Sequence, residues 1–279
     1  VYKRQPKTLG KTLKHLGPGF ILSASIVGSG ELIATTQLGA KAGFVAMWVI
    51  LVSCLVKVAV QLEFGKRAIM TGETTFASFN SLPGPKIGKA NWTVWTWLVL
   101  MLIKFLQVGA IVGLVSVLLN MAFPGLSDFW WLIIVVIAIS SIVVSGYYKI
   151  LEVLSVSMIG LFTIFTFFSL IALQSTESAI SIANITSGLQ FQIPEGAGMA
   201  IVVIGAFGLT GVGGDEIMAY NYWLIEKGYA SNTGQNDGTE EWNRRAKGWI
   251  KVMYIDAIFA MIVYTLVTVS YTHLTLPTT

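Results

Sequence analysis

Seven long apolar segments constrain this 279-residue chain more than any other feature. A helix needs roughly 20 apolar residues to cross the hydrocarbon core of a bilayer. The segments cover about residues 19–40, 44–65, 93–120, 129–146, 151–173, 198–225 and 249–269. Between them lie turn-forming stretches such as Leu82–Pro85 and Phe123–Gly125. The sequence therefore predicts an all-α, polytopic membrane protein whose main surroundings are a lipid bilayer.

Composition supports this class and excludes several others. Hydrophobic residues make up 54% of the chain and charged residues only 11%, whereas a soluble domain carries roughly a quarter charged residues. The one cysteine, Cys54, lies inside an apolar segment, which excludes a disulfide framework or a cysteine-rich metal site. The net charge of +4 does not gather on a soluble face, so no nucleic-acid partner is expected.

The distribution of lysine and arginine predicts an orientation in the membrane. Basic residues occupy the N-terminal segment and every second loop: Lys7, Lys11, Lys14, Lys66, Arg67, Lys86, Lys89, Lys149, Lys227, Arg244, Arg245, Lys247 and Lys251. The alternate loops contain only Lys41. Because cytoplasmic loops are enriched in basic residues, the N-terminus is expected in the cytoplasm, with the protein in a bacterial cytoplasmic membrane.

Both ends of the chain resemble translated sequencing-adapter sequence. Residues 1–5 and 270–279 are polar runs, and the second interrupts an apolar helical pattern without a capping signal. We expect both to be artefacts, which leaves one transmembrane transporter domain over residues 6–269 and implies a fragment of a longer protein. The alternative, that both are genuine polar termini, remains open.

Two glycine-rich interruptions carry the functional prediction. The first segment contains Gly28-Ser29-Gly30-Glu31, and the sixth contains Gly213-Gly214-Asp215-Glu216. Glycine tolerates dihedrals that stop a helix, and the carbonyls thereby freed need a ligand or a cavity because lipid cannot bind them. Matching interruptions in two halves of a chain indicate a transporter binding site. We expect these eight residues to bind substrate or ion; close helix packing through small residues is the alternative.

Other polar residues inside the segments are candidates for coupling. Lys57 and Lys104 lie too deep to reach the interface easily, and Gln107 follows Lys104 on the same helical face. Each lysine is either an ion-pair partner or a built-in cation that tunes coupling, and Asp256 in the last segment is a further coupling candidate.

With these residues in view, the chain resembles the natural resistance-associated macrophage protein (Nramp) family of divalent-metal transporters between residues 14 and 269. The motifs that carry the resemblance are Gly17–Phe20, Thr71-Gly72, the break in the sixth segment and Ile255-Asp256. It implies an inverted-repeat (5+5) transporter fold, here truncated after about seven transmembrane helices. The first repeat would cover about 17–173 and the second would start within about 198–269. Proton-linked import of divalent metal is also implied.

The departures from the family pattern change the expected ion. Where the family has Asp-Pro-Gly-Asn, this chain has Gly28–Glu31, and Gly213–Asp215 replaces Met-Pro-His, so the metal-selecting methionine is missing. An acidic pair that moves protons in the family is replaced by Lys104 and Gln107, which leaves protons as coupling ions open. The remaining metal ligands would be Glu31, Asp215 and Glu216, and all-oxygen ligand sets favour hard cations such as Mg²⁺ or Mn²⁺.

The sequence thus predicts a secondary transporter that moves a divalent cation by alternating access, with no resident cofactor and an undetermined oligomeric state. A same-fold carrier of a small organic cation or amino acid is the nearest alternative, and a non-transporting metal sensor is the second. An enzyme is not expected, because no paired-histidine motif or Gly-x-Ser-x-Gly elbow is present.

Overall fold

The computed structural model describes residues 5–6, 8–146, 148–176 and 179–274. The chain divides into two compact units, Val1–Glu73 with Glu152–Thr279, and Thr74–Leu151. The predicted artefacts fall largely outside the described residues, although the last helix continues to Leu274. Their assignment as non-native sequence stays a prediction.

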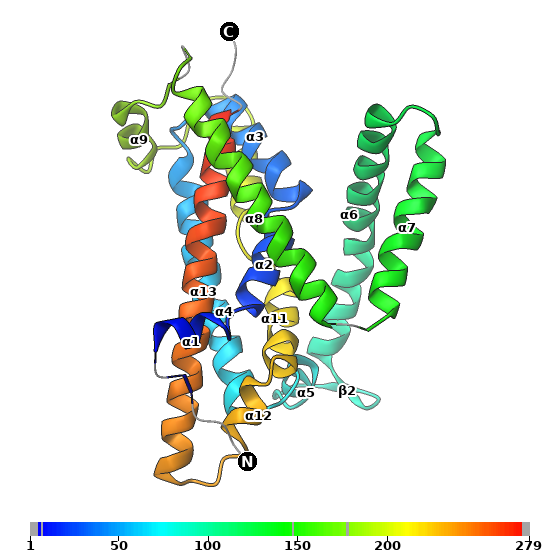
Figure 1. The fold of residues 1–279 in the computed structure, drawn as a ribbon, viewed down its shortest axis with the longest axis vertical. Helices are drawn as coiled ribbons and strands as arrows, with labels where there is room; N and C mark the ends of the chain where they lie inside the picture. The colour runs from blue at the N-terminus through cyan, green and yellow to red at the C-terminus, as the bar shows by residue number, and fades with distance from the viewer. Residues whose placement is uncertain (1–4, 7, 147, 177–178, 275–279) are drawn as a thin grey trace. The chain divides into compact units, whose positions relative to one another are not determined.

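The first unit is built of helices. They are α1 (Leu9–Leu13), α2 (Pro18–Ile26), α3 (Ser29–Ala42), α4 (Met47–Thr71), most of α8 (Tyr148–Leu173), α9 (Ile182–Gly188), α10 (Met199–Leu209), α11 (Gly214–Glu226), α12 (Tyr229–Thr233) and α13 (Glu240–Leu274). The long α13 packs along α4, as Figure 1 shows, and it also contacts α2 and α3. Its fully buried Trp249 and Met253 belong to the same apolar core as Ile50 of α4 and Tyr220 of α11. The core also includes Ile26 and Val212, which lie next to the first break and within the second.

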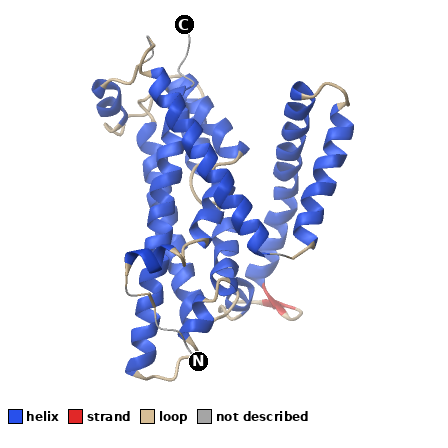
Figure 2. Ribbon diagram, viewed as in Figure 1, coloured by secondary structure: helices blue, strands red, loops and turns tan. Residues whose placement is uncertain are grey.

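The second unit contains two long helices, one short helix and a short hairpin (Figure 2). Its elements are α5 (Thr75–Asn80), β1 (Lys86–Ile87), β2 (Ala90–Asn91), α6 (Trp92–Ala122) and α7 (Asp128–Val144). The two strands pair antiparallel, and α6 packs against α7. Large apolar side chains such as Leu106 and Val144 are 78% and 85% exposed, which suits surroundings of hydrocarbon rather than water.

Within the described part of the chain, five stretches are long and apolar enough to cross a membrane, and one of them contains the interruption between α10 and α11. They are Met47–Thr71, Trp92–Ala122, Glu152–Leu173, Met199–Glu226 and Glu240–Ser270. Of the other two predicted segments, 19–40 is divided between α2 and α3, and the fourth is the shorter apolar helix α7. Segment 19–40 is not one helix because the break at Gly28 leaves two short helices where the hydropathy pattern shows one continuous segment.

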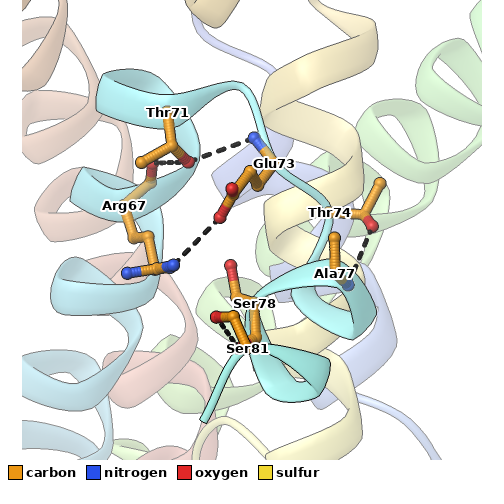
Figure 3. A network of polar contacts seen from close by, with 7 residues as sticks. All are labelled: Arg67, Thr71, Glu73, Thr74, Ala77, Ser78 and Ser81. Carbon is orange, nitrogen blue, oxygen red and sulfur yellow. Dashed lines mark hydrogen bonds and ion pairs between the residues drawn. The ribbon is translucent and has the colours of Figure 1, made fainter. Parts of the chain in front are cut away.

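The polar end of α4 shows how a membrane helix terminates in this chain (Figure 3). Gly72 has a left-handed conformation and its N–H donates to the carbonyl of Ala68. The Thr71 hydroxyl donates to the Arg67 carbonyl and accepts from the Glu73 N–H, while the Arg67 guanidinium pairs with the Glu73 carboxylate at 2.9 Å. The Thr71-Gly72 motif is therefore a helix C-terminus in which glycine is required by its positive φ.

Candidate cation site at two broken helices

The first break separates α2 from α3. Only Val27 and Gly28 lie between the two helices, and Gly28 has an extended conformation that makes it the N-cap residue of α3. Ser29, Gly30 and Glu31 form the first turn of α3. The glycine pattern predicted this interruption, and the carboxylate that follows it lies at the positive end of a new helix.

The second break separates α10 from α11. Residues 210–213 are not helical, and Gly211 has φ +73. A Cβ on Gly211 would lie 3.2 Å from the Cα of Cys54 in α4, so both the backbone conformation and the close approach of the break to α4 require glycine here. Gly213 is the N-cap residue of α11 and Gly214 its first residue.

Two hydrogen bonds join the breaks crosswise. The Gly211 N–H donates to the Glu31 carboxylate at 3.0 Å, and the Ser25 hydroxyl at the end of α2 donates to the Glu216 carboxylate at 3.0 Å. In keeping with this, α3 packs against α10 and α2 against α11. This is the arrangement expected when two equivalent broken helices run in opposite directions through a membrane.

Glu31 is the most deeply placed carboxylate of the predicted ligand set. It is only 3% exposed, and one of its oxygens accepts from Gly211. The second oxygen, Oε2, is buried and accepts no hydrogen bond within normal donor–acceptor distances among the described residues, although the Thr268 side chain of α13 is near enough to act on the carboxylate. Burying a carboxylate oxygen without a partner lowers the stability of the fold by about 2–3 kcal/mol or more. Such an oxygen is chemically suited to a cation.

The other two predicted ligands are directed differently. Glu216 accepts from the Gly213 N–H at 2.6 Å as well as from Ser25, so its carboxylate turns back to the start of its own helix. Asp215 and Glu216 both lie inside the first turn of α11, and adjacent helical residues point about 100° apart. Among the described residues, no three acidic, histidine or cysteine side chains come close enough together to hold a metal ion. Glu31, Asp215 and Glu216 are therefore not gathered into one ligand cluster.

Lys57 lies beside the second break and contacts backbone oxygens. Its ammonium donates to the carbonyls of Phe207, Gly208 and Thr210 at 2.9, 2.9 and 2.6 Å. The hydroxyl of Ser53, one turn earlier on α4, donates to the Phe207 and Thr210 carbonyls. The carbonyls freed at this break were expected to face a cavity or a ligand; instead α4 supplies donors to them.

Asp256 has a different environment from the break residues. It is completely buried, and its two oxygens accept from the N–H groups of Gly17 and Gly19 at 3.0 and 2.6 Å. A Cβ on Gly19 would lie 2.8 Å from the Asp256 carboxylate, which explains why glycine occupies this position. Asp256 thus caps the N-terminus of α2, where a negative charge is favoured by the helix dipole. Its role in coupling stays a prediction.

Lys104 and Gln107 belong to α6 in the second unit. Lys104 is partly buried and Gln107 is exposed. The contacts at the two breaks do not test the predicted part of Lys104 and Gln107 in coupling, which stays a prediction.

Several residues of the site were not predicted. The sequence analysis does not name Ser25 or Ser53 as site residues, yet their hydroxyls donate to Glu216 and to the freed carbonyls. A signal was available for Ser53, because it lies four residues before Lys57 on the same face of one helix. No local signal marks Ser25, since its partner is 191 residues away in the sequence.

The chain was also compared with known proteins. No curated protein matches it in a sequence search. The family model described as natural resistance-associated macrophage protein-like matches residues 19–275, which is most of the chain. The match includes both broken helices and the helices that hold them. The chain therefore belongs to the Nramp family, whose members are membrane transporters of divalent metals rather than enzymes.

Proposed function

We propose that this protein moves a hard divalent cation, such as Mg²⁺ or Mn²⁺, across the membrane by alternating access at the two breaks. The observation that carries the proposal is the position of Glu31. Its carboxylate is buried between two broken helices, and one oxygen has no hydrogen-bond partner among the described residues.

The chemistry of the available donors supports a hard ion. The side chains that flank the breaks present carboxylate and hydroxyl oxygens from Glu31, Glu216 and Ser25. Oxygen ligands favour Mg²⁺ and Mn²⁺ over softer metals. A Cβ on Gly214 would meet nothing within 4 Å, so the second break is not packed against a neighbour at this residue, and this openness is compatible with a partly hydrated ion. Mg²⁺ usually retains several of its waters in proteins.

Loading of the site requires a rearrangement from the present geometry. The predicted ligands do not form a cluster, because Gly211 and Ser25 hold the carboxylates of Glu31 and Glu216. Exchange of these two hydrogen bonds for a shared cation would draw α3 and α11 together at their N-termini. The reverse exchange would release the ion. The two sets of bonds would then define the two states between which an alternating-access transporter moves.

The membrane placement completes the proposal. The basic loops favour a cytoplasmic N-terminus and a bacterial cytoplasmic membrane. We propose no resident cofactor. Protons remain the candidate coupling ions.

The decisive experiment is uptake of Mn²⁺ and Mg²⁺ into proteoliposomes that contain the complete gene product. Glu31→Gln preserves the shape of the side chain and removes its charge, so uptake is expected to fall to the level of empty vesicles. Glu195→Gln, at an exposed loop position, is the matched control and should transport normally. Uptake by Glu31→Gln at the wild-type rate would remove Glu31 from the site.

The same vesicles separate the alternatives. Competition by small organic amines without any response to divalent metals would identify a carrier of organic cations. Metal binding without flux would identify a sensor.

A further inference from the structure

The C-terminal end of α10 holds a concentrated set of backbone acceptors. The carbonyl oxygens of Phe207, Gly208 and Thr210 all lie within 2.6–2.9 Å of one nitrogen, the Nζ of Lys57. The last carbonyls of a helix lack partners inside the helix and carry the negative end of its dipole. Within a membrane, such a set of oxygens needs a positively charged or strongly donating partner.

Three carbonyl oxygens around one point resemble the coordination of a small monovalent cation. Unwound carbonyls and the C-terminal ends of half-helices bind such ions in transporters with broken helices. An ammonium group carries the same single charge and donates three hydrogen bonds. Lys57 therefore matches this acceptor set in both charge and number of donors.

Neighbouring groups hold the ammonium in this place. The Phe207 ring lies 5.8 Å from the Lys57 nitrogen and adds a cation–π contact. Glu31 and Glu216 are the acidic groups of the two breaks that act electrostatically on Lys57. The Ser53 hydroxyl shares the Phe207 and Thr210 carbonyls with Lys57, which also donates to the Gly208 carbonyl.

We propose that Lys57 is a tethered monovalent cation that permanently fills an ion site at the end of α10. The protein consequently needs no dissolved monovalent ion at this break. Replacing Lys57 with an uncharged residue should expose a site for Na⁺, K⁺ or NH₄⁺. This site is distinct from the proposed divalent site, because it is made of backbone carbonyls and not of carboxylates. The proposal concerns the second break alone and does not rest on the identity of the transported substrate.

The test measures thermal unfolding of the complete, detergent-solubilised protein by intrinsic tryptophan fluorescence. Sodium, potassium, ammonium and choline chlorides are compared at equal ionic strength. The wild-type protein should melt at one temperature in all four salts. Lys57→Met should melt lower in choline chloride and recover in at least one of the small cations. Lys57→Arg, which keeps the charge, should respond as the wild type does.

Ser53→Ala is the matched control. It removes a donor from two of the same carbonyls but leaves the ammonium in place, so its melting temperature should not depend on the cation. If Lys57→Met does not fold in choline chloride, it is purified throughout in ammonium chloride. Recovery of folded protein only in ammonium supports the proposal. Failure in every salt, or equal melting of Lys57→Met in all four, overturns it.

A transport measurement separates this proposal from the proposed function. Uptake of Mn²⁺ by Lys57→Met should fall at least about tenfold in choline chloride, because charge-assisted hydrogen bonds are removed. Uptake should return in the sodium, potassium or ammonium salt that restores the melting temperature. A wild-type protein that moves no metal would refute the proposed function, while the melting experiment would still decide the role of Lys57. Tighter Mn²⁺ binding by Lys57→Met, with no dependence on monovalent ions, would show that Lys57 acts only as a nearby charge and would overturn the proposal.

Discussion

The Glu31 carboxylate accepts a hydrogen bond from the backbone N–H of Gly211 at 3.0 Å, across 180 residues of sequence. This bond connects the start of α3 with the loop between α10 and α11. It leaves the other Glu31 oxygen buried and without a partner among the described residues. The bond holds the two breaks together, and in the proposed function it has a second task, which is to orient a carboxylate for a cation.

Two substitutions at Glu31 should separate these tasks. Glu31→Gln retains an oxygen that accepts from Gly211, so its melting temperature should equal or exceed that of the wild type. Glu31→Ala leaves the Gly211 N–H without its acceptor and should lose about 1–3 kcal/mol of stability. Thermal unfolding in the absence of divalent metal measures both. Equal destabilisation by the two variants would contradict the assignment of the bond.

Gly211→Ala should destabilise the second break. Alanine at φ +73 is strained, and its Cβ would approach the Cα of Cys54 to 3.2 Å. The expected loss is about 1–3 kcal/mol, measured as a lower melting temperature. Gly208→Ala is the control, because a Cβ there meets nothing within 4 Å and the residue lies inside α10. That variant should melt at or above the wild-type temperature; a loss equal to that of Gly211→Ala would count against the argument.

Asp256→Ala should loosen the N-terminus of α2. It removes the acceptor of two N–H groups, those of Gly17 and Gly19, in a fully buried place. Hydrogen bonds to charged groups contribute about 1.5–3 kcal/mol each, so the variant should fold poorly or melt far below the wild type. Asp256→Asn keeps one oxygen acceptor and should lose less. Hydrogen exchange of the peptides around α2 locates the effect, and protection there that equals the wild type would disprove the capping role.

The ion pair between Glu152 of α8 and Lys227 at the end of α11 should contribute measurably to stability. The two side chains are only 18% and 20% exposed, so removing one partner leaves a partly buried charge. Glu152→Gln is expected to cost about 1–3 kcal/mol. Glu63→Gln breaks a comparable pair with Lys66, but Glu63 is 68% exposed, and the expected loss is at most about 0.5 kcal/mol. Thermal unfolding compares the two, and equal losses would show that the burial of the Glu152 pair is unimportant.

Hydropathy and glycine placement were sufficient to predict the class of protein and the position of both breaks. A run of apolar residues encodes a membrane helix locally, and glycines at 28, 211, 213 and 214 interrupt such a run regardless of what surrounds it. The number of continuous spans was predicted less well, because hydropathy does not register a two-residue interruption such as Val27-Gly28.

What the sequence by itself determined is therefore the membrane, the helices and the places where they stop. Only the tertiary structure decided which groups meet at those places. Lys57 binds carbonyls 150 residues or more away, and Asp256 caps a helix that begins 238 residues before it. The physical reason is that a freed carbonyl or N–H accepts any suitable partner, and packing of the helices selects the one that comes within hydrogen-bond distance.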